Sequence, residues 1–276
     1  MKARIKFQKY GAMKFVGHLD VMRYFQKLFR RANIDNEYSK GFSPHQIMSF
    51  ASPLGVGLTS DGEYLDVQLL SADAPEVMVE RMNAVITEGF RIVGYRPLKD
   101  TEQNVKNVTA MALVASADYL VQLRDGYEIG AGINNQESFI KAFTEFMNST
   151  EIVIGKKTKK SEKEVDIRPM ITLVAFTKEE YEDKRIGTLE EQLRVTKENA
   201  NSKPESVSES YDNGVKVYLQ VDTGSASNLK PELVMEAFCE YLGVEYNKYA
   251  WQSHRIEVYT RNIETGKLAA LDQVDR

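Results

Sequence analysis

Cysteine and histidine are scarce in this sequence of 276 residues, which has one cysteine, Cys239, and three histidines. A single cysteine excludes an internal disulfide and fits a reducing compartment. It also excludes an iron–sulfur cluster held by this chain alone, because such clusters generally need several cysteine thiolates. No histidine has the H-x-x-x-H or H-x-E spacing of a metal site. We expect no bound metal and no cofactor.

Long apolar runs and phosphate-binding loops are also missing. No apolar stretch approaches the ~20 residues that cross a membrane, and the first residues, MKARIKF, alternate like a strand rather than a signal peptide. We therefore expect a cytoplasmic protein with no membrane partner. Gly55-x-Gly57 lacks the third glycine of a dinucleotide site and the lysine of a P-loop, so turn glycines are the better interpretation.

Charge is distributed unevenly along the chain. Residues 1–50 contain ten lysines and arginines and three acids, a balance of +7, which leaves −11 for the remainder because the whole chain carries −4. A basic segment in an acidic chain indicates a local anionic partner, such as nucleic acid, a phosphate group or an acidic protein face. A solvated charged surface is the alternative.

The first 97 residues show the order strand, helix, strand, strand, helix, strand. Residues 2–9 have period two, with Ala3, Ile5 and Phe7 on one face, which predicts a half-buried strand. From His18, a period of three and four predicts a helix with a buried stripe of Leu19, Met22, Phe25 or Gln26, Phe29 and Ala32. The other expected elements are strands at 46–51, 63–70 and 90–96 and a helix at 75–87. Residues 60–62, Ser-Asp-Gly, are expected to form a turn.

The second half repeats this scheme, so the sequence predicts an α+β fold of two tandem ferredoxin-like (split βαβ) modules. The first module would span 1–97, a linker 98–116 and the second module 117–262. Within the second module, residues 177–213 are acidic and rich in Ser, Asn and Lys, which predicts a mobile insertion. Residues 263–276 are expected to form a flexible tail.

The strongest binding candidate is a basic helix face followed by a ring-bearing loop. Arg23, Lys27 and Arg30 are spaced four and three apart and therefore share one face. Cations that hold phosphates and rings that stack on bases are typical of single-stranded RNA recognition. The expected anion-binding or RNA-binding residues are Lys14, Arg23, Lys27, Arg30, Tyr38, Lys40, Phe42 and His45. Under the opposite interpretation, the aromatic residues are core and the cations are solvated.

Two stretches resemble the signature of the bacterial radical-SAM-linked protein family. The matching residues are Lys14-Phe15, His18-Leu19-Asp20, Arg23, Arg30 to Ala32, Tyr38-Ser39, Gly41-Phe42, Pro44-His45, Ser49-Phe50, Gly57 and Gly62 to Asp66. Val165 to Pro169 is similar to the family's D-I-R-P element, which adds Arg168 to the anion-binding candidates. The chain departs from the family at Gln46-Ile47, where proline and lysine are common.

The resemblance implies a domain of unknown function that accompanies a radical-SAM protein, beside it or fused to it. Because this chain lacks the cluster cysteines, it would be a companion of the enzyme, with no catalysis of its own. It would dock on the radical-SAM protein and help to bind the substrate, which we expect to be RNA or a translation-related target.

Two alternatives assign the chain other roles. It would be an independent RNA-binding or RNA-processing protein if its tandem modules act like those of repeat-cleaving CRISPR RNA endonucleases, whose glycine-rich loop has only Gly224 as a counterpart here. His18, His45 and Asp20 would be catalytic in such an enzyme. A metal-dependent enzyme would use the two histidines with Asp20, Glu63 or Asp66, although every such pairing is long-range.

Overall fold

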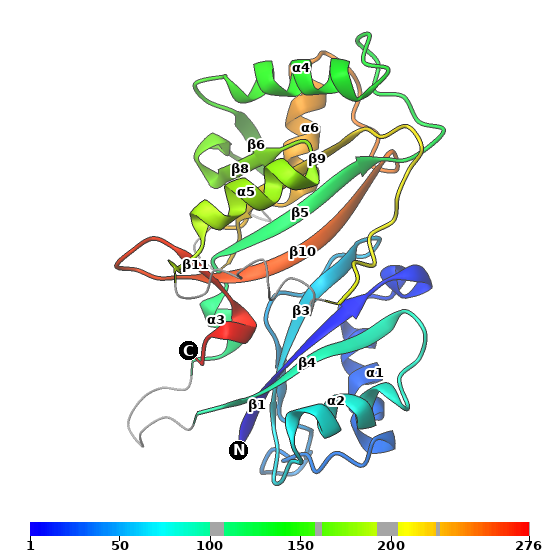
Figure 1. The fold of residues 1–276 in the computed structure, drawn as a ribbon, viewed down its shortest axis with the longest axis vertical. Helices are drawn as coiled ribbons and strands as arrows, with labels where there is room; N and C mark the ends of the chain where they lie inside the picture. The colour runs from blue at the N-terminus through cyan, green and yellow to red at the C-terminus, as the bar shows by residue number, and fades with distance from the viewer. Residues whose placement is uncertain (100–107, 158–161, 192–203, 225–226, 276) are drawn as a thin grey trace. The chain divides into compact units, whose positions relative to one another are not determined.

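The computed structural model describes residues 1–99, 108–157, 162–191, 204–224 and 227–275. The chain forms two compact units. The first consists of Met1–Ala115, Leu189–Ser208 and Arg255–Arg276, and the second of Ser116–Thr188 and Glu209–His254. The strand β10 (Trp251–Arg261) begins in the second unit and continues into the first. The described residues contain six α-helices, so the architecture is mixed α/β (Figure 1).

The first unit contains the predicted series of elements. They are β1 (Lys2–Lys9), α1 (His18–Arg31), β2 (Met48–Phe50), β3 (Thr59–Gln68), α2 (Pro75–Asn83) and β4 (Phe90–Leu98), followed by the short helix α3 (Ala110–Leu113). The order β4-β1-β3 is antiparallel throughout. Strand β2 pairs with one end of β3, at Leu65–Val67. The rest of that edge of β3 is taken by β10.

The core of this unit lies between the sheet and the helices α1 and α2. Ala3, Ile5 and Phe7 of β1 are buried against both helices, as the alternation predicted. In α1 the buried residues are Val21, Phe25, Leu28 and Phe29, whereas Leu19 is 61% exposed. The prediction for Leu19 was therefore wrong, because the apolar stripe is centred on Phe25 and Leu19 lies on the side of the first turn that faces solvent.

The opposite face of β1 is also covered. Arg4 and Gln8 are buried, although the alternation predicted a half-buried strand. Arg4 donates hydrogen bonds to the carbonyls of Leu271 (2.7 Å) and Val274 (3.1 Å). The expected flexible tail at 263–276 thus includes β11 (Leu268–Ala270), which pairs with β10, and a 3-10 turn at Leu271–Gln273. Leu268 and Leu271 are buried, which accounts for the packing of this apolar segment on the unit.

Gly62 lies inside β3 rather than in the turn that was expected at 60–62. A Cβ at this position would lie 2.8 Å from the Glu257 carboxylate and 3.0 Å from the Ile256 carbonyl. Glycine here permits a close backbone approach between two strands, which is one of its known uses within sheets. The turn prediction was wrong because glycine is used both in turns and where two strands approach closely.

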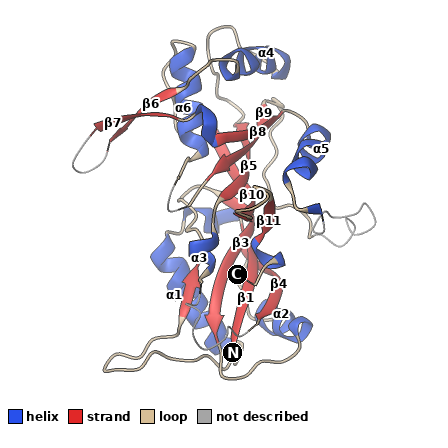
Figure 2. Cartoon of the chain, turned by 90° about the vertical axis from the view of Figure 1, so that its left-hand side faces the viewer, coloured by secondary structure: helices blue, strands red, loops and turns tan. Residues whose placement is uncertain are grey.

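The second unit is built on β5 (Ser116–Leu123). Its strand order is β10-β5-β9-β8, with β8 at Ile171–Ala175 and β9 at Lys216–Asp222. The helices are α4 (Gln136–Met147), α5 (Lys178–Thr188) and α6 (Pro231–Tyr241). Strands β6 (Val153–Lys157) and β7 (Glu162–Asp166) form a separate hairpin (Figure 2). Phe139, Phe143 and Phe146 of α4 pack their rings with Phe238 of α6.

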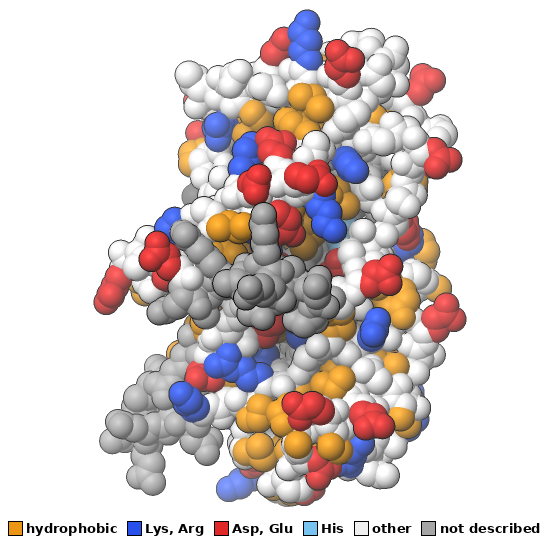
Figure 3. Space-filling model, viewed as in Figure 1, with side chains coloured by type: hydrophobic (Ala, Val, Ile, Leu, Met, Phe, Trp, Pro, Cys, Tyr) orange, Lys and Arg blue, Asp and Glu red, His pale blue; other side chains and the backbone are white. Residues whose placement is uncertain are grey.

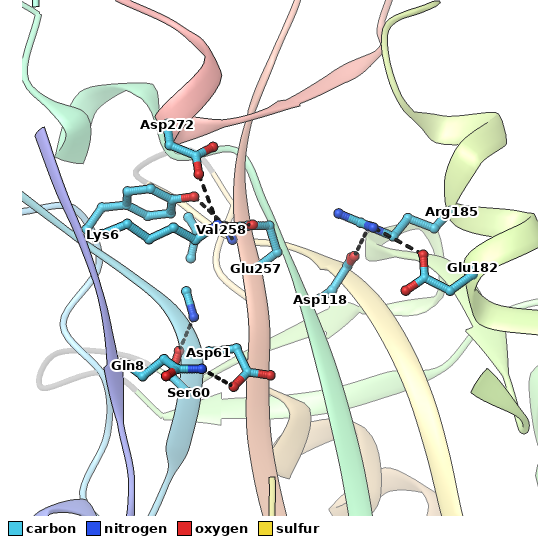
Figure 4. Close-up of polar contacts among 12 residues, drawn as sticks. Lys6, Gln8, Ser60, Asp61, Asp118, Glu182, Arg185, Glu257, Val258 and Asp272 are labelled. Atoms are coloured by element: carbon cyan, nitrogen blue, oxygen red, sulfur yellow. Dashed lines mark hydrogen bonds and ion pairs between the residues drawn. The ribbon is translucent and has the colours of Figure 1, made fainter. Parts of the chain in front are cut away.

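Helix α5 occupies the first part of the segment that was predicted as a mobile insertion. Tyr181 stacks on Tyr218 with ring centroids 4.9 Å apart and donates a hydrogen bond to the buried Asp118 (2.6 Å). Arg185, four residues later, also contacts Asp118 (3.5 Å; Figure 4). These i, i+4 side chains give an acidic helix a buried side. Residues 192–203 of the insertion and 100–107 of the predicted linker lie outside the described residues.

Candidate nucleic-acid interface

Helix α1 presents the predicted basic face to solvent. Burial of Val21, Phe25, Leu28 and Phe29 fixes the rotation of the helix, and Arg23, Lys27 and Arg30 are all exposed. Asp20 pairs with Arg23 at 2.9 Å, with both side chains about two-thirds exposed. On the face of the molecule in Figure 3, by contrast, acidic and basic side chains are interspersed. The exposed face of α1 is therefore predominantly cationic.

The loop between Tyr38 and His45 is closed at its base and exposed at its tip. Tyr38 and Gln46 form an antiparallel bridge. The Ser39 N–H donates to the His45 carbonyl (2.8 Å), and Ser39 Oγ hydrogen-bonds His45 Nδ1 (2.8 Å). Gly41 adopts a φ of +125°, which favours glycine. The next residue, Phe42, is fully exposed, which is unusual for a phenylalanine.

The base of this loop lies against α1. Gln46 Nε2 is 3.4 Å from the carbonyl of Gln26 and 3.4 Å from the hydroxyl of Tyr38. Gln26 lies one turn before Arg30, whose Nε also contacts the Gln26 carbonyl (3.3 Å). The structure therefore brings the loop to the basic helix. Tyr38 is 46% exposed, and Lys40 is exposed. The name α1–loop surface is used below for the exposed residues Arg23, Lys27, Arg30, Tyr38, Lys40 and Phe42.

The candidate catalytic residues His18 and His45 and the candidate anion-binding residue Lys14 have structural contacts. His18 begins α1, and its ring meets Phe50 edge-on at 5.2 Å. His45 closes the loop through Ser39. Lys14 lies at the end of a 3-10 turn, where its ammonium lies 5.4 Å from the Phe15 ring centre and its carbonyl accepts from Gly57 (2.8 Å). In the part of the chain that the structure describes, no three His, Cys, Asp or Glu side chains gather as metal ligands.

Arg168 belongs to the second unit, where it links the end of α4 to the segment that follows β7. Asp166 Oδ1 accepts hydrogen bonds from the backbone N–H groups of Ile152 (2.8 Å) and Arg168 (3.0 Å). The Arg168 guanidinium donates from Nε to the Met147 carbonyl at the end of α4 (2.9 Å). Arg168 also lines an open depression of about 420 Å³ with Thr172 and Lys184. Its D-I-R-P segment therefore joins α4 to the β6–β7 hairpin.

A buried ionic network in the first unit was not found from the sequence. Lys6 Nζ contacts Glu257 (2.6 Å) and Asp272 (3.0 Å; Figure 4). The Tyr64 hydroxyl donates to Glu257 (2.6 Å). Burial alone would lower the pKa of Lys6, but the two carboxylates outweigh it and raise that pKa. Burial and then Glu257 raise the pKa of Tyr64. The raised pKa values keep the Lys6 ammonium and the Tyr64 hydroxyl protonated near neutral pH.

Two further pairs extend this network. Arg4 donates to both oxygens of Asp66 (2.7 and 3.1 Å), and Arg255 pairs with Glu63. Glu63 and Asp66, the carboxylates of the metal-enzyme hypothesis, thus each form an ion pair with an arginine. The available sequence signal was opposite charge on separate strands: Lys and Arg alternate in β1, acids recur in β3, and β10 carries Glu257. Their pairing depends on strand order, which a single sequence does not specify.

The thiol of Cys239 should be unreactive in the folded protein. Cys239 is buried in α6, and burial raises its pKa to about 11. Because alkylating reagents attack the thiolate, modification at pH 8 should be at least about a hundredfold slower than for a free cysteine. Mass spectrometry after iodoacetamide treatment, with and without urea, measures this ratio. Equal rates in both conditions would contradict the burial of the thiol.

The sequence matches one family model over residues 2–231, described as an uncharacterised protein conserved in bacteria (DUF2344). The chain belongs to this family. No curated protein matches the chain. The described helices include none that is long and apolar enough to span a membrane. The match covers the α1–loop surface and the D-I-R-P segment, so both lie inside the DUF2344 region.

Proposed function

We propose that this DUF2344 protein is a non-catalytic cytoplasmic companion of a radical-SAM enzyme and holds single-stranded RNA on its α1–loop surface. The observation that carries the proposal is a fully exposed Phe42 on a closed loop whose base lies against a helix with three exposed cations. An aromatic ring in this position contributes nothing to the core, so we infer that its role is to contact another molecule.

The chemistry of the surface suits a single strand. Arg23, Lys27, Arg30 and Lys40 can neutralise phosphates, and rings such as Phe42 and Tyr38 can stack on unpaired bases. Stacking tolerates any base, and the phosphate contacts carry no sequence information. A protein with these contacts would bind an exposed segment of RNA rather than a duplex, whose bases are already stacked.

The radical-SAM partner is supported by the resemblance of the Lys14–Ala32 and Tyr38–Asp66 stretches to the radical-SAM-linked signature. A chain with one cysteine cannot hold the enzyme's cluster itself. The structural contacts of His18 and His45 favour binding over acid–base catalysis. A companion that binds RNA near an enzyme raises the local concentration of substrate without contributing to the chemistry.

The architecture that we propose for this role is a pair of ferredoxin-like modules at residues 1–97 and 117–262, with a linker at 98–116. Its support is the strand order. Strands β4-β1-β3-β2 and β10-β5-β9-β8 both follow the order four, one, three, two of that fold. Helices α1 and α2 would be the crossovers of the first module, and α4 and α6 those of the second.

Charge reversal on α1 should weaken RNA binding and its dependence on salt. For Arg23→Glu/Lys27→Glu/Arg30→Glu, we expect the slope of log affinity against log salt concentration to fall in magnitude by about 2, because each phosphate contact to a single strand contributes ~0.7. Fluorescence anisotropy of a labelled single-stranded RNA measures the slope. The control Lys141→Glu/Lys178→Glu reverses exposed lysines on α4 and α5 and should have little effect. Equal losses in both variants would reject the α1–loop surface.

Affinity capture from native extract, with and without RNase, tests the partner. Recovery of a radical-SAM protein that survives RNase supports docking between the two proteins. Recovery of RNA alone, lost in the charge-reversed variant, would replace the companion by an independent RNA-binding protein. Recovery of neither would reject both.

A further inference from the structure

The base of the Tyr38–His45 loop contains two buried amides, and three of their four polar atoms lack a hydrogen-bond partner among the described residues. Asn36 is 5% exposed, and neither its Nδ2 nor its Oδ1 has a partner among the described residues. Gln46 is 4% exposed, and its Oε1 is also unpartnered in this part of the chain. Among the described residues, Gln46 Nε2 makes two long contacts, each at 3.4 Å, to the Gln26 carbonyl and the Tyr38 hydroxyl.

Both amides lie on the face of the loop base that packs on helix α1. Alternate residues of an extended segment share a face, so Asn36 lies on the side of Tyr38, and Gln46 on the side of Phe50. Tyr38 and Gln46 are directly paired, which places all four side chains on one face. Phe50 on that face contacts Phe25 of α1 at 5.7 Å. Gln46 therefore lies between the loop and the helix, next to the Tyr38 hydroxyl, and Asn36 lies on the same face.

Burial of an amide without hydrogen-bond partners lowers the stability of the folded protein. Buried polar atoms without partners are rare in native proteins, because each loses its hydrogen bonds to water and gains none. Apolar side chains of similar size would fill the same space without that cost. The neighbouring buried positions Ile34 and Phe50 are apolar. Two buried amides with three unpartnered polar atoms among the described residues, at the base of an exposed loop, indicate a ligand that supplies the missing partners.

We infer that Asn36 and Gln46 read the edge of one nucleobase, adenine, whose ring stacks on Tyr38. This inference rests on the proposed RNA-binding function. An amide presents an N–H donor beside a C=O acceptor, and adenine presents a matching acceptor and N6 donor on one edge. Entry of the base would replace the long contact between Gln46 and the Tyr38 hydroxyl. The α1–loop surface would thus combine non-specific phosphate contacts with one specific base site.

Binding to single-stranded oligoadenylate, oligocytidylate and oligouridylate, each about 12 nucleotides long, tests this inference. The wild type should prefer oligoadenylate by about tenfold, the scale of one bidentate amide–base contact. Asn36→Leu/Gln46→Met should bind all three with the affinity that the wild type has for oligouridylate. Its melting temperature should be equal or higher, because the unpaired amides are gone.

A second variant keeps the test decisive if the double variant fails to fold. Gln46→Glu retains size and polarity but removes the N–H donor, so it should lose the preference for oligoadenylate and favour oligocytidylate, whose N4 group donates. Equal binding of the three oligonucleotides by the wild type would overturn the base-reading inference and leave the proposed function standing. Absence of binding to all three would overturn both.

Discussion

Replacement of Arg255 by methionine should lower the free energy of unfolding by about 3–5 kcal/mol. The Arg255 side chain is buried and donates from Nε to Glu63 (2.8 Å) and from Nη2 to the Ser52 carbonyl (2.6 Å). Methionine fills a similar volume but leaves the buried Glu63 carboxylate without its charge partner. A buried charge without a partner is among the most destabilising single changes in a protein. Urea unfolding followed by circular dichroism measures the loss.

The double variant Glu63→Leu/Arg255→Met should recover most of that stability, because it removes both charges and leaves apolar side chains in their place. Arg91→Met is the matched control, since Arg91 is exposed on β4, and its effect should stay within about 0.5 kcal/mol. If Arg255→Met and Arg91→Met have the same stability, the ionic network described here is not formed.

Truncation of Phe25 to alanine should cost about 3–5 kcal/mol of stability. Phe25 is fully buried at the centre of the first unit, and its ring centroid lies 4.7 Å from Phe7, 5.7 Å from Phe50 and 5.8 Å from Phe90. The cavity would remove contacts between α1 and strands β1, β2 and β4 at once. Because Phe25 also fixes the rotation of α1, RNA affinity should fall as well.

Lys27→Ala, two positions along the same helix, separates packing from charge. It should change stability by less than about 0.5 kcal/mol, because Lys27 is exposed, while reducing RNA affinity. Thermal unfolding and anisotropy on both variants give the comparison. A stability loss from Lys27→Ala as large as that from Phe25→Ala would show that α1 is rotated from the orientation described.

Local sequence patterns predicted the elements that depend on local physics. The start of α1 at His18, the start of α2 at Pro75 and the limits of β1 agree with the periodicity and with proline at the first helical turn. The buried face of β1 followed from alternation. The basic face of α1 followed from spacing alone, since residues three and four apart share one side of any helix.

Features set by distant residues were not predictable in this way. The pairing of Lys6 with Glu257 joins positions 251 apart in the sequence, and Gly62 in β3 was read as a turn because its role depends on the approach of β10. The strand and turn at 268–273 were not predicted for the same reason. Leu268 and Leu271 are apolar, but two such residues form no clear pattern in the sequence. In the α1–loop surface, exposed Phe42 fitted the RNA hypothesis, whereas Asn36 and Gln46 gave no signal because an unpaired amide is visible only in a structure.

The function that we propose places single-stranded RNA on the α1–loop surface. Ultraviolet cross-linking of bound single-stranded RNA, followed by mass spectrometry of the cross-linked peptides, tests this placement most directly. Aromatic rings stacked on bases should cross-link, so we expect adducts at Tyr38 or Phe42 that disappear when α1 carries the charge reversals. Adducts confined to residues outside 14–50, or unchanged by the charge reversals, would contradict it.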